Sequence, residues 1–287
     1  MLKRLIHASS VFALVAGLAS VAAAQDLKLP RPSQKGDVFQ TVGLTDVKIA
    51  YSRPGVKGRT IWGGLVPYDK VWRTGANEAT TISFTTDVKV KGQALPAGTY
   101  SLHTIPTPTD WTIIFNKAAD QWGSYSYNDS MDALRIQVTP QAHEMTEWMT
   151  FSFPQISVES ATIALDWEKL RVPIDIQVET VQTALAGART AMASLKADDS
   201  RTAFRAASFA FDNNVAMEEA MVWIDKSLSI KEDWLNLRLK ANMMAKQGNM
   251  KEAVAFGEKA IAAAKKDAPP EEVTKLETSV GEWKGKL

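Results

Sequence analysis

The sequence predicts a segregated α+β fold, in which an antiparallel β-sandwich precedes an α-helical hairpin-repeat region. Between Asp37 and about Thr180, apolar and polar residues alternate with period two, and Gly and Pro interrupt the pattern. After Thr180 the apolar period becomes helical, and β-branched residues become rarer. We therefore expect four parts: a signal peptide at 1–24, a linker at 25–36, a sandwich domain at 37–180 and a helical domain at 181–287.

The expected strands are short runs in which every second residue is apolar. They lie at 47–51, 134–138, 149–153, 161–167 and 172–178. Lys91-Gly92 predicts a tight hairpin, and Pro96-Ala97-Gly98 predicts a second turn shortly after it. Many short strands without helical segments between them favour an antiparallel sandwich or barrel, and we prefer a jelly-roll-like sandwich.

The helical half contains a weak internal repeat. "AMEEAMVWIDKSLSI" aligns with "NMKEAVAFGEKAIAA", which places Ala220 on Ala253 and Trp223 on Phe256. This spacing is similar to tetratricopeptide repeats, although Gly257 departs from their pattern, and a generic helical bundle remains an alternative. Helix breaks are expected near 198–199, 212–214, 247–249 and 269–270.

The N-terminus has the pattern of a secretory signal. Lys3 and Arg4 precede an apolar run that ends in Ala22-Ala23-Ala24, so we expect cleavage after Ala24 and a periplasmic or secreted protein. An uncleaved membrane anchor is the alternative. The chain has no cysteine, which excludes a disulfide framework and a lipid-bearing cysteine.

The charge of the chain is almost balanced, with 33 basic and 32 acidic residues. A neutral chain has no field that would attract nucleic acid or anionic lipid. We therefore expect neither a nucleic-acid partner nor membrane insertion after signal cleavage.

The stretch "VWRTGANEATTISF" suggests a binding site. In a strand from Glu78 to Thr86, Glu78 shares a face with Ile82 and Phe84 and would point toward the core. A carboxylate there needs a partner, and Arg73 is the expected one, with Trp72 as an apolar wall. The alternative is that Arg73 and Glu78 only fix the loop to the sheet.

Other loops supply further polar and aromatic residues that suit a sugar or a peptidoglycan fragment. The candidate pocket comprises Arg53, Arg59, Trp72, Arg73, Asn77, Glu78, His103, Asn116, Trp122 and Tyr127. Core packing under a long loop is the alternative for the aromatic residues in this set.

Several kinds of catalytic site lack their sequence signatures. No H-x-x-x-H spacing connects His103 or His143, and no G-x-S-x-G turn occurs. We expect no metal, no cofactor and no catalytic residue, and we favour a protein that is not an enzyme. A carboxylate pair that includes Glu78 would still permit glycan hydrolysis.

The first half of the chain resembles a known family. The run "YSRPGVKGR…GGLVPY…VWRTGANEAT…AGTYSL…IP…W…FNK…WG" is similar to the domain of unknown function 2911, found in secreted bacterial proteins, and the resemblance covers about residues 28–180. It implies no activity, because the family has none established.

Three functions remain open at this point. The preferred one is an exported envelope protein that binds a small polar or glycan-like ligand and meets a protein partner through its helical repeats. The alternatives are a carboxylate-dependent hydrolase of cell-wall glycans and a purely structural or assembly protein.

Overall fold

The structure is a computed structural model that describes residues 29–287. The expected signal peptide and its cleavage site lie outside the described residues. Residues 33–287 form one unit by their internal contacts, and its sandwich and its helices are described separately below. No helix in the described range has both the length and the apolar character needed to cross a membrane.

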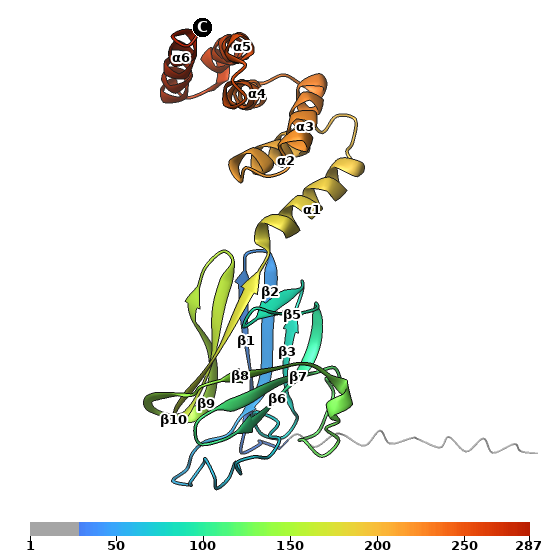
Figure 1. Cartoon of the computed structure of the whole chain (residues 1–287), viewed down its shortest axis with the longest axis vertical. Helices are drawn as coiled ribbons and strands as arrows, with labels where there is room; N and C mark the ends of the chain where they lie inside the picture. The colour runs from blue at the N-terminus through green and yellow to red at the C-terminus, as the bar shows by residue number, and fades with distance from the viewer. Residues whose placement is uncertain (1–28) are drawn as a thin grey trace, which may run out of the picture. The chain divides into compact units, whose positions relative to one another are not determined.

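The strands form two antiparallel sheets, which confirms the predicted fold class (Figure 1). The larger sheet has the order β1-β2-β3-β6-β7-β8. Its strands are β1 (Gln34–Val42), β2 (Thr45–Arg53), β3 (Thr80–Phe84), β6 (Gly98–Pro106), β7 (Trp111–Asn116) and β8 (Asp132–Val138). The smaller sheet has the order β5-β4-β10-β9 and contains β4 (Val88–Val90), β5 (Gln93–Leu95), β9 (Gln141–Ile156) and β10 (Ser160–Val178).

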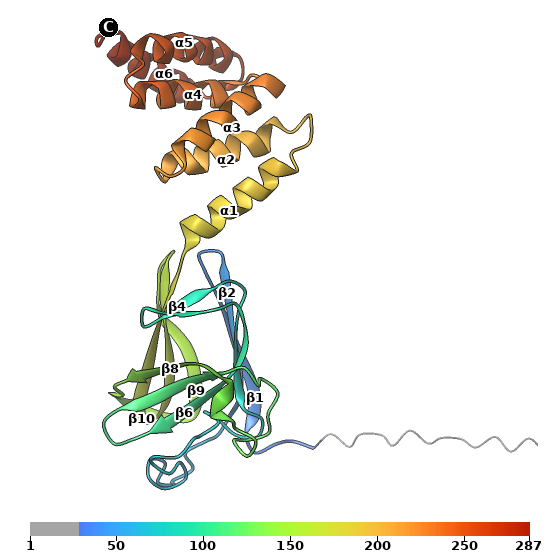
Figure 2. The same ribbon diagram turned by 45° about the vertical axis from the view of Figure 1, so that its right-hand side comes forward.

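The two sheets form two layers (Figure 2). Side chains from both sheets make up one hydrophobic core. At one place in this core four tryptophans meet, with Trp62 edge-on to Trp111 at 4.8 Å and Trp72 stacked on Trp167 at 5.8 Å. Aromatic pairs in these geometries stabilise a core beyond the area that they bury. This cluster therefore fixes the loop 54–79 that carries Trp62 and Trp72.

The predicted hairpin is confirmed, because Lys91 and Gly92 both have positive φ, at 46° and 78°, as a two-residue type I′ turn requires. The two expected strands at 161–167 and 172–178 are parts of one long strand, β10. Its alternation changes because the register shifts around Glu168, which has a φ of 56°. β1 begins at Gln34, ahead of the start expected at residue 37.

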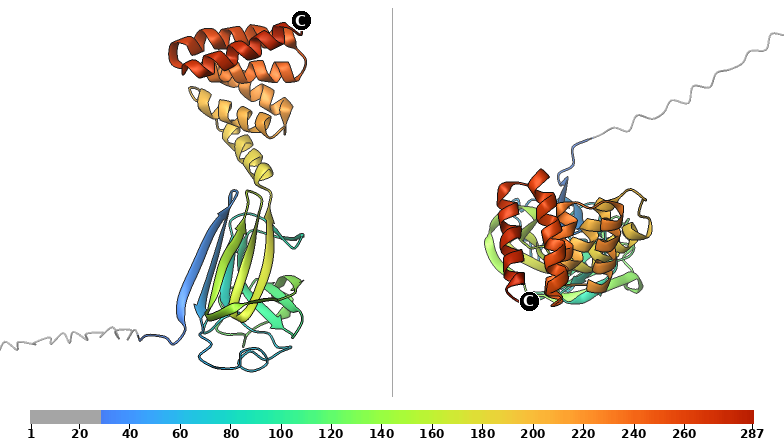
Figure 3. Two further views of the ribbon diagram at one scale, coloured as in Figure 1. Left: turned by 90° about the vertical axis from the view of Figure 1, so that its left-hand side faces the viewer. Right: turned by 90° about the horizontal axis from the view of Figure 1, so that it is seen from above.

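The helical half contains six helices in the described range, α1 (Thr180–Ala193), α2 (Ser200–Asp212), α3 (Met217–Ile230), α4 (Trp234–Lys246), α5 (Met250–Asp267) and α6 (Pro270–Lys284). Each packs on the next along the chain, and α5 contacts both α4 and α6 (Figure 3). All four expected breaks fall between helices. A fifth break, before α4, has no Gly or Pro and arises because Asp233 and Asn236 form a capping box.

The small residues of the internal repeat are buried, including Ala220 and Ser227 in α3 and Ala253 in α5. Gly257 is buried where α5 meets α6. A Cβ atom there would overlap the Val280 side chain and lie 3.1 Å from the Trp283 ring. Gly257, which departs from the repeat pattern, therefore allows α6 to pack closely against α5.

We predict that Gly257→Ala destabilises the protein by about 1–3 kcal/mol, because the added methyl group must displace Val280 or Trp283. Gly281→Ala in α6 is the control, since nothing lies within 4 Å of its added Cβ and alanine favours a helix by about 1 kcal/mol. Thermal unfolding followed by circular dichroism at 222 nm would compare the two variants. A Gly257→Ala variant at least as stable as Gly281→Ala would contradict this account of the packing.

Candidate functional site

The outer face of the larger sheet carries its polar side chains. In β2 the odd-numbered residues from Val47 to Tyr51 enter the core, so Lys48, Ala50 and Ser52 face outward. Their cross-strand neighbours in β1 and β3 follow the same alternation. A continuous polar surface therefore crosses these three strands.

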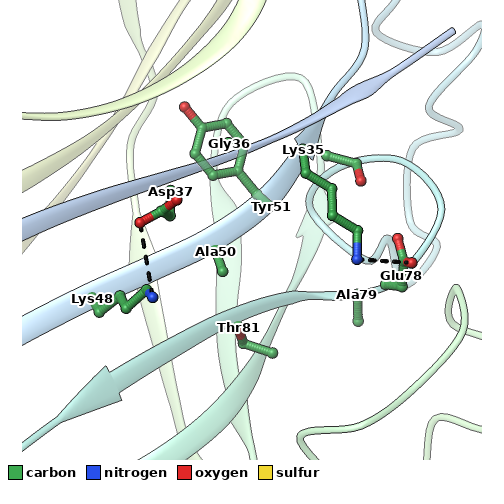
Figure 4. A pocket seen from close by; sticks show the side chains of 10 residues that line it. Lys35, Gly36, Asp37, Lys48, Ala50, Tyr51, Glu78, Ala79 and Thr81 are labelled. Atoms are coloured by element: carbon green, nitrogen blue, oxygen red, sulfur yellow. Dashed lines mark ion pairs between the residues drawn. The ribbon is translucent and has the colours of Figure 1, made fainter. Parts of the chain in front are cut away.

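A groove with a volume of about 280 Å³ lies on this surface (Figure 4). Its lining residues are Lys35, Gly36, Asp37, Lys48, Ala50, Tyr51, Ser52, Glu78, Ala79 and Thr81. The side chains of Ala50 and Ser52 on β2 and of Ala79 ahead of β3 are small. Those of Lys35 on β1 and Lys48 on β2 are long. The contrast in side-chain length creates the hollow.

Two ion pairs cross the groove. Lys35 Nζ lies 3.3 Å from Glu78 Oε1, and Lys48 Nζ lies 3.8 Å from Asp37 Oδ2 (Figure 4). Both lysine side chains are more than half exposed. Exposed ion pairs contribute only about 0–1 kcal/mol to stability. A polar ligand can therefore take over these charges at little cost to the fold.

Glu78 lies directly opposite Trp122 in a short antiparallel bridge. Ala79 N donates to Gln121 O at 2.9 Å, and Gly123 N donates to Asn77 O at 3.0 Å. This pattern makes Glu78 and Trp122 a non-hydrogen-bonded pair, in which the side chains leave the backbone on the same side and lie close together. Trp122 is 58% exposed and is not among the residues that line the groove, so the bridge places an exposed indole next to Glu78, which does line it.

The expected pair between Arg73 and Glu78 is wrong. Ile82 and Phe84 enter the core as predicted, but β3 begins only at Thr80, so its alternation does not extend to Glu78. Thr74 and Asn77 have φ values of 54° and 58°, and these left-handed residues turn the chain between Arg73 and Glu78. Among the described residues, no ion pair joins Arg73 to a carboxylate, and Glu78 pairs with Lys35.

Trp72 does not line the groove either. It is buried in the tryptophan cluster, and its Nε1 donates to Gly75 O at 3.1 Å. Its backbone exchanges two hydrogen bonds of 2.8 Å with Thr104 of β6. Trp72 is therefore a core residue that holds the neighbouring turn.

Three other expected pocket residues form hydrogen bonds that hold neighbouring strands and loops in place. Arg53 donates to Met149 O and to Thr150 Oγ1 on β9, which ties the two sheets together. Arg59 donates to the carbonyl groups of Val56 and Gly55 within its own loop. Asn77 donates to Ser33 O at 3.2 Å and so fixes the turn before Glu78.

Two of the remaining candidates, His103 on β6 and Asn116 on β7, lie on the same outer face beneath the loop 117–131, and the other two, Trp122 and Tyr127, belong to that loop. Asn116 is fully buried and donates to Asn128 O and to Asp132 Oδ1. The Tyr127 hydroxyl donates to Asp132 Oδ2 and accepts from Arg135 Nη2, each at 2.7 Å. Burial, together with the bond to Asp132, raises the pKa of Tyr127 to about 12. These contacts clasp the loop onto β7 and β8.

His103 lies under this loop with its ring centroid 5.1 Å from that of Tyr127. Its side chain is fully buried, and neither ring nitrogen has a hydrogen-bond partner among the described residues. Burial lowers the pKa of His103 to about 4, and the nearby Asp132 opposes this shift only in part. The imidazole is therefore neutral at pH 7.

Sequence reasoning missed Lys35, Asp37 and Lys48 in the groove, and Asp132 and Arg135 under the loop. Residue 35 had been assigned to a linker, although the alternation in "QKGDVFQTV" was present as a signal. Asp132 and Arg135 give no local signal, because their roles depend on pairing between β7 and β8.

A family model described as "Protein of unknown function (DUF2911)" matches residues 33–176, half of the chain. The chain belongs to this family. The matched range holds the whole groove and the loop 117–131 and ends within β10. No curated protein and no solved structure matches the chain.

His103 and His143 of the DUF2911 domain lie in different sheets, on β6 and β9. His143 Nδ1 lies 2.9 Å from Glu144 O, and its Nε2 lies 3.8 Å from Asp166 Oδ2. Across residues 29–287, no three His, Cys, Asp or Glu side chains gather closely enough to hold a metal ion.

We predict that acid destabilises this domain through His103. Its pKa is about 4 when folded and 6.5 when unfolded, so the unfolded chain binds the proton first as the pH falls. Relative to the value above pH 6.5, protonation of the unfolded chain therefore lowers the free energy of unfolding progressively between pH 6.5 and about pH 4, by up to about 3 kcal/mol.

The measurement is the melting temperature between pH 7 and pH 3.5, for the natural protein and for His103→Phe. The variant should show a smaller loss over this range. Equal pH slopes for both proteins would exclude His103 as the cause.

Proposed function

We propose that the β-sandwich binds a small polar, glycan-like ligand in the groove beside Glu78. The observation that carries this proposal is the backbone bridge that sets the exposed Trp122 opposite Glu78, the residue that lines the groove and pairs with Lys35. The hollow of about 280 Å³ lies near the lower end of the range for ligand pockets. Its size suits one sugar ring better than a long chain.

The side chains at this edge match the chemistry of a sugar. An indole offers an apolar face to the C–H groups of a pyranose ring, and a carboxylate accepts hydrogen bonds from its hydroxyl groups. The lysine ammonium groups donate to ring and hydroxyl oxygens. Because both lysine side chains are more than half exposed, a ligand can replace either lysine as the partner of its carboxylate without opening the fold.

The setting of this activity is the cell envelope. The basic start, the apolar run and the Ala22-Ala23-Ala24 site support export, which would bring the groove into contact with cell-wall glycans. The helical region with its tetratricopeptide-like spacing would then serve as a surface for a protein partner.

We predict that N-acetylglucosamine or N-acetylmuramic acid binds this protein, and that Glu78→Gln and Trp122→Ala each weaken binding at least tenfold. Trp148→Ala is the control, because Trp148 is also exposed, at 44%, but lies on β9 opposite Gly55 and not opposite Glu78. Saturation-transfer NMR and calorimetric titration would measure the affinities. If no cell-wall sugar binds, or if the Trp148 variant loses as much affinity as the Trp122 variant, the proposal fails.

A hydrolase is the second candidate, because Asp37 lines the same groove as Glu78. Two carboxylates that flank a sugar can act as acid and as base or nucleophile. Each carboxylate here is held in an ion pair with a lysine, at 3.3 Å for Glu78 and 3.8 Å for Asp37, so neither is free to exchange a proton with a ligand without breaking that pair. This arrangement supports binding more than catalysis.

The two candidates differ in turnover. We expect no release of nitrophenol from 4-nitrophenyl N-acetylglucosaminide by the natural protein above the level of Glu78→Gln and Asp37→Asn variants. Turnover that either substitution abolishes would instead establish the hydrolase.

A further inference from the structure

Unmet hydrogen-bonding groups gather over β6, beneath the loop 117–131. Trp72 pairs with Thr104, so Arg73 follows at the position opposite His103 and on the same outer face. Arg73 is half-buried, and its Nε has no hydrogen-bond partner among the described residues. The two ring nitrogens of His103 also lack a hydrogen-bond partner among the described residues.

Gln121 brings a fourth such atom to this place. Its Nε2 donates to Ala118 O at 2.7 Å and lies 3.4 Å from Ser101 Oγ. Ser101 and His103 lie two residues apart on one face of β6. Gln121 Oε1 is buried and accepts no hydrogen bond within the described part of the chain.

Such a cluster is costly unless something fills it, since buried polar atoms in native proteins nearly always have a partner. Arg73 Nε–H is a donor, Gln121 Oε1 is an acceptor, and neutral His103 supplies one of each. An anion would leave both acceptors unmet, and a cation would face the Arg73 guanidinium. The cluster therefore suits a neutral group that both donates and accepts.

The cluster adjoins the groove through the bridge 77–79 to 121–123. Trp122 faces outward beside Glu78, and its neighbour Gln121 points into the sheet. Lys117 N donates to Met131 O at 2.9 Å and closes the base of the loop, while residues 124–126 stay unpaired with any strand. His103 is fully buried, so a ligand group that contacts it requires residues 124–126 to move away from the sheet.

We propose that Arg73, His103 and Gln121 form a subsite for the acetamido group of the sugar bound in the groove, an inference that rests on the proposed function. The carbonyl oxygen of an acetamide has two lone pairs for the two donors, and its N–H meets one of the two acceptors. A site built to hydrogen-bond a group rejects an analogue that lacks it, because its own buried atoms then stay unpaired.

The test compares N-acetylglucosamine with glucose, which lacks the acetamido group. We expect N-acetylglucosamine to bind at least tenfold more tightly. His103→Phe should remove this preference, while Glu78→Gln should weaken both sugars. His103→Phe should also raise the melting temperature of the free protein at pH 7, because it deletes two unmet polar atoms.

The outcomes separate the two proposals. If neither sugar binds, the proposed function fails. If both bind equally, or if His103→Phe keeps the preference, the subsite is wrong although the groove stands. A lower melting temperature in His103→Phe with unchanged binding would mean that the cluster holds ordered water only. If His103→Phe does not fold, Arg73→Met should likewise remove the preference, and its failure to do so would overturn the subsite.

Discussion

The backbone turn from Thr74 to Asn77 determines where the functional side chains of this domain lie. On one side of the turn, Trp72 is fixed by the tryptophan cluster and by its two hydrogen bonds to Thr104. On the other side, the bridge between Glu78 and Trp122 fixes the chain again. Two left-handed residues between these anchors send Arg73 to β6 and Glu78 to the groove. Arg73 and Glu78, which are close in sequence, thus lie in two neighbouring polar regions, the region over His103 and the groove.

The two regions differ in how strongly the fold holds them. The groove is lined by two ion pairs whose lysine side chains are more than half exposed, so these ammonium groups are accessible to a ligand. The region over His103 is buried and contains polar atoms without partners, which lowers the stability of the free protein. Such a cost is typical of sites that are completed by a bound group. The clasp of Tyr127, Asp132 and Arg135 keeps the loop closed over it.

The candidate site could be predicted only in part. Glu78, Trp122, His103 and Asn116 could be selected from residue type and loop context, although Glu78 alone of these four lines the groove. The pairing of Arg73 with Glu78 was wrong because strand alternation was extended across a turn whose positive φ angles cannot be deduced from "TGAN". Lys35 was missed because β1 had been assigned to a linker.

The sequence by itself determined the two periodicities, and therefore a sandwich followed by helices, because alternation with period two and helical spacing are local properties of the chain. It also determined the Lys91-Gly92 hairpin, since few residue pairs accept two positive φ angles. Only the tertiary structure decided which polar residues meet. The groove and the region over His103 depend on strand order and on the bridge between Glu78 and Trp122, and these pairings join residues far apart in the sequence. Long-range pairing is set by the packing of the whole core, which local sequence patterns do not specify.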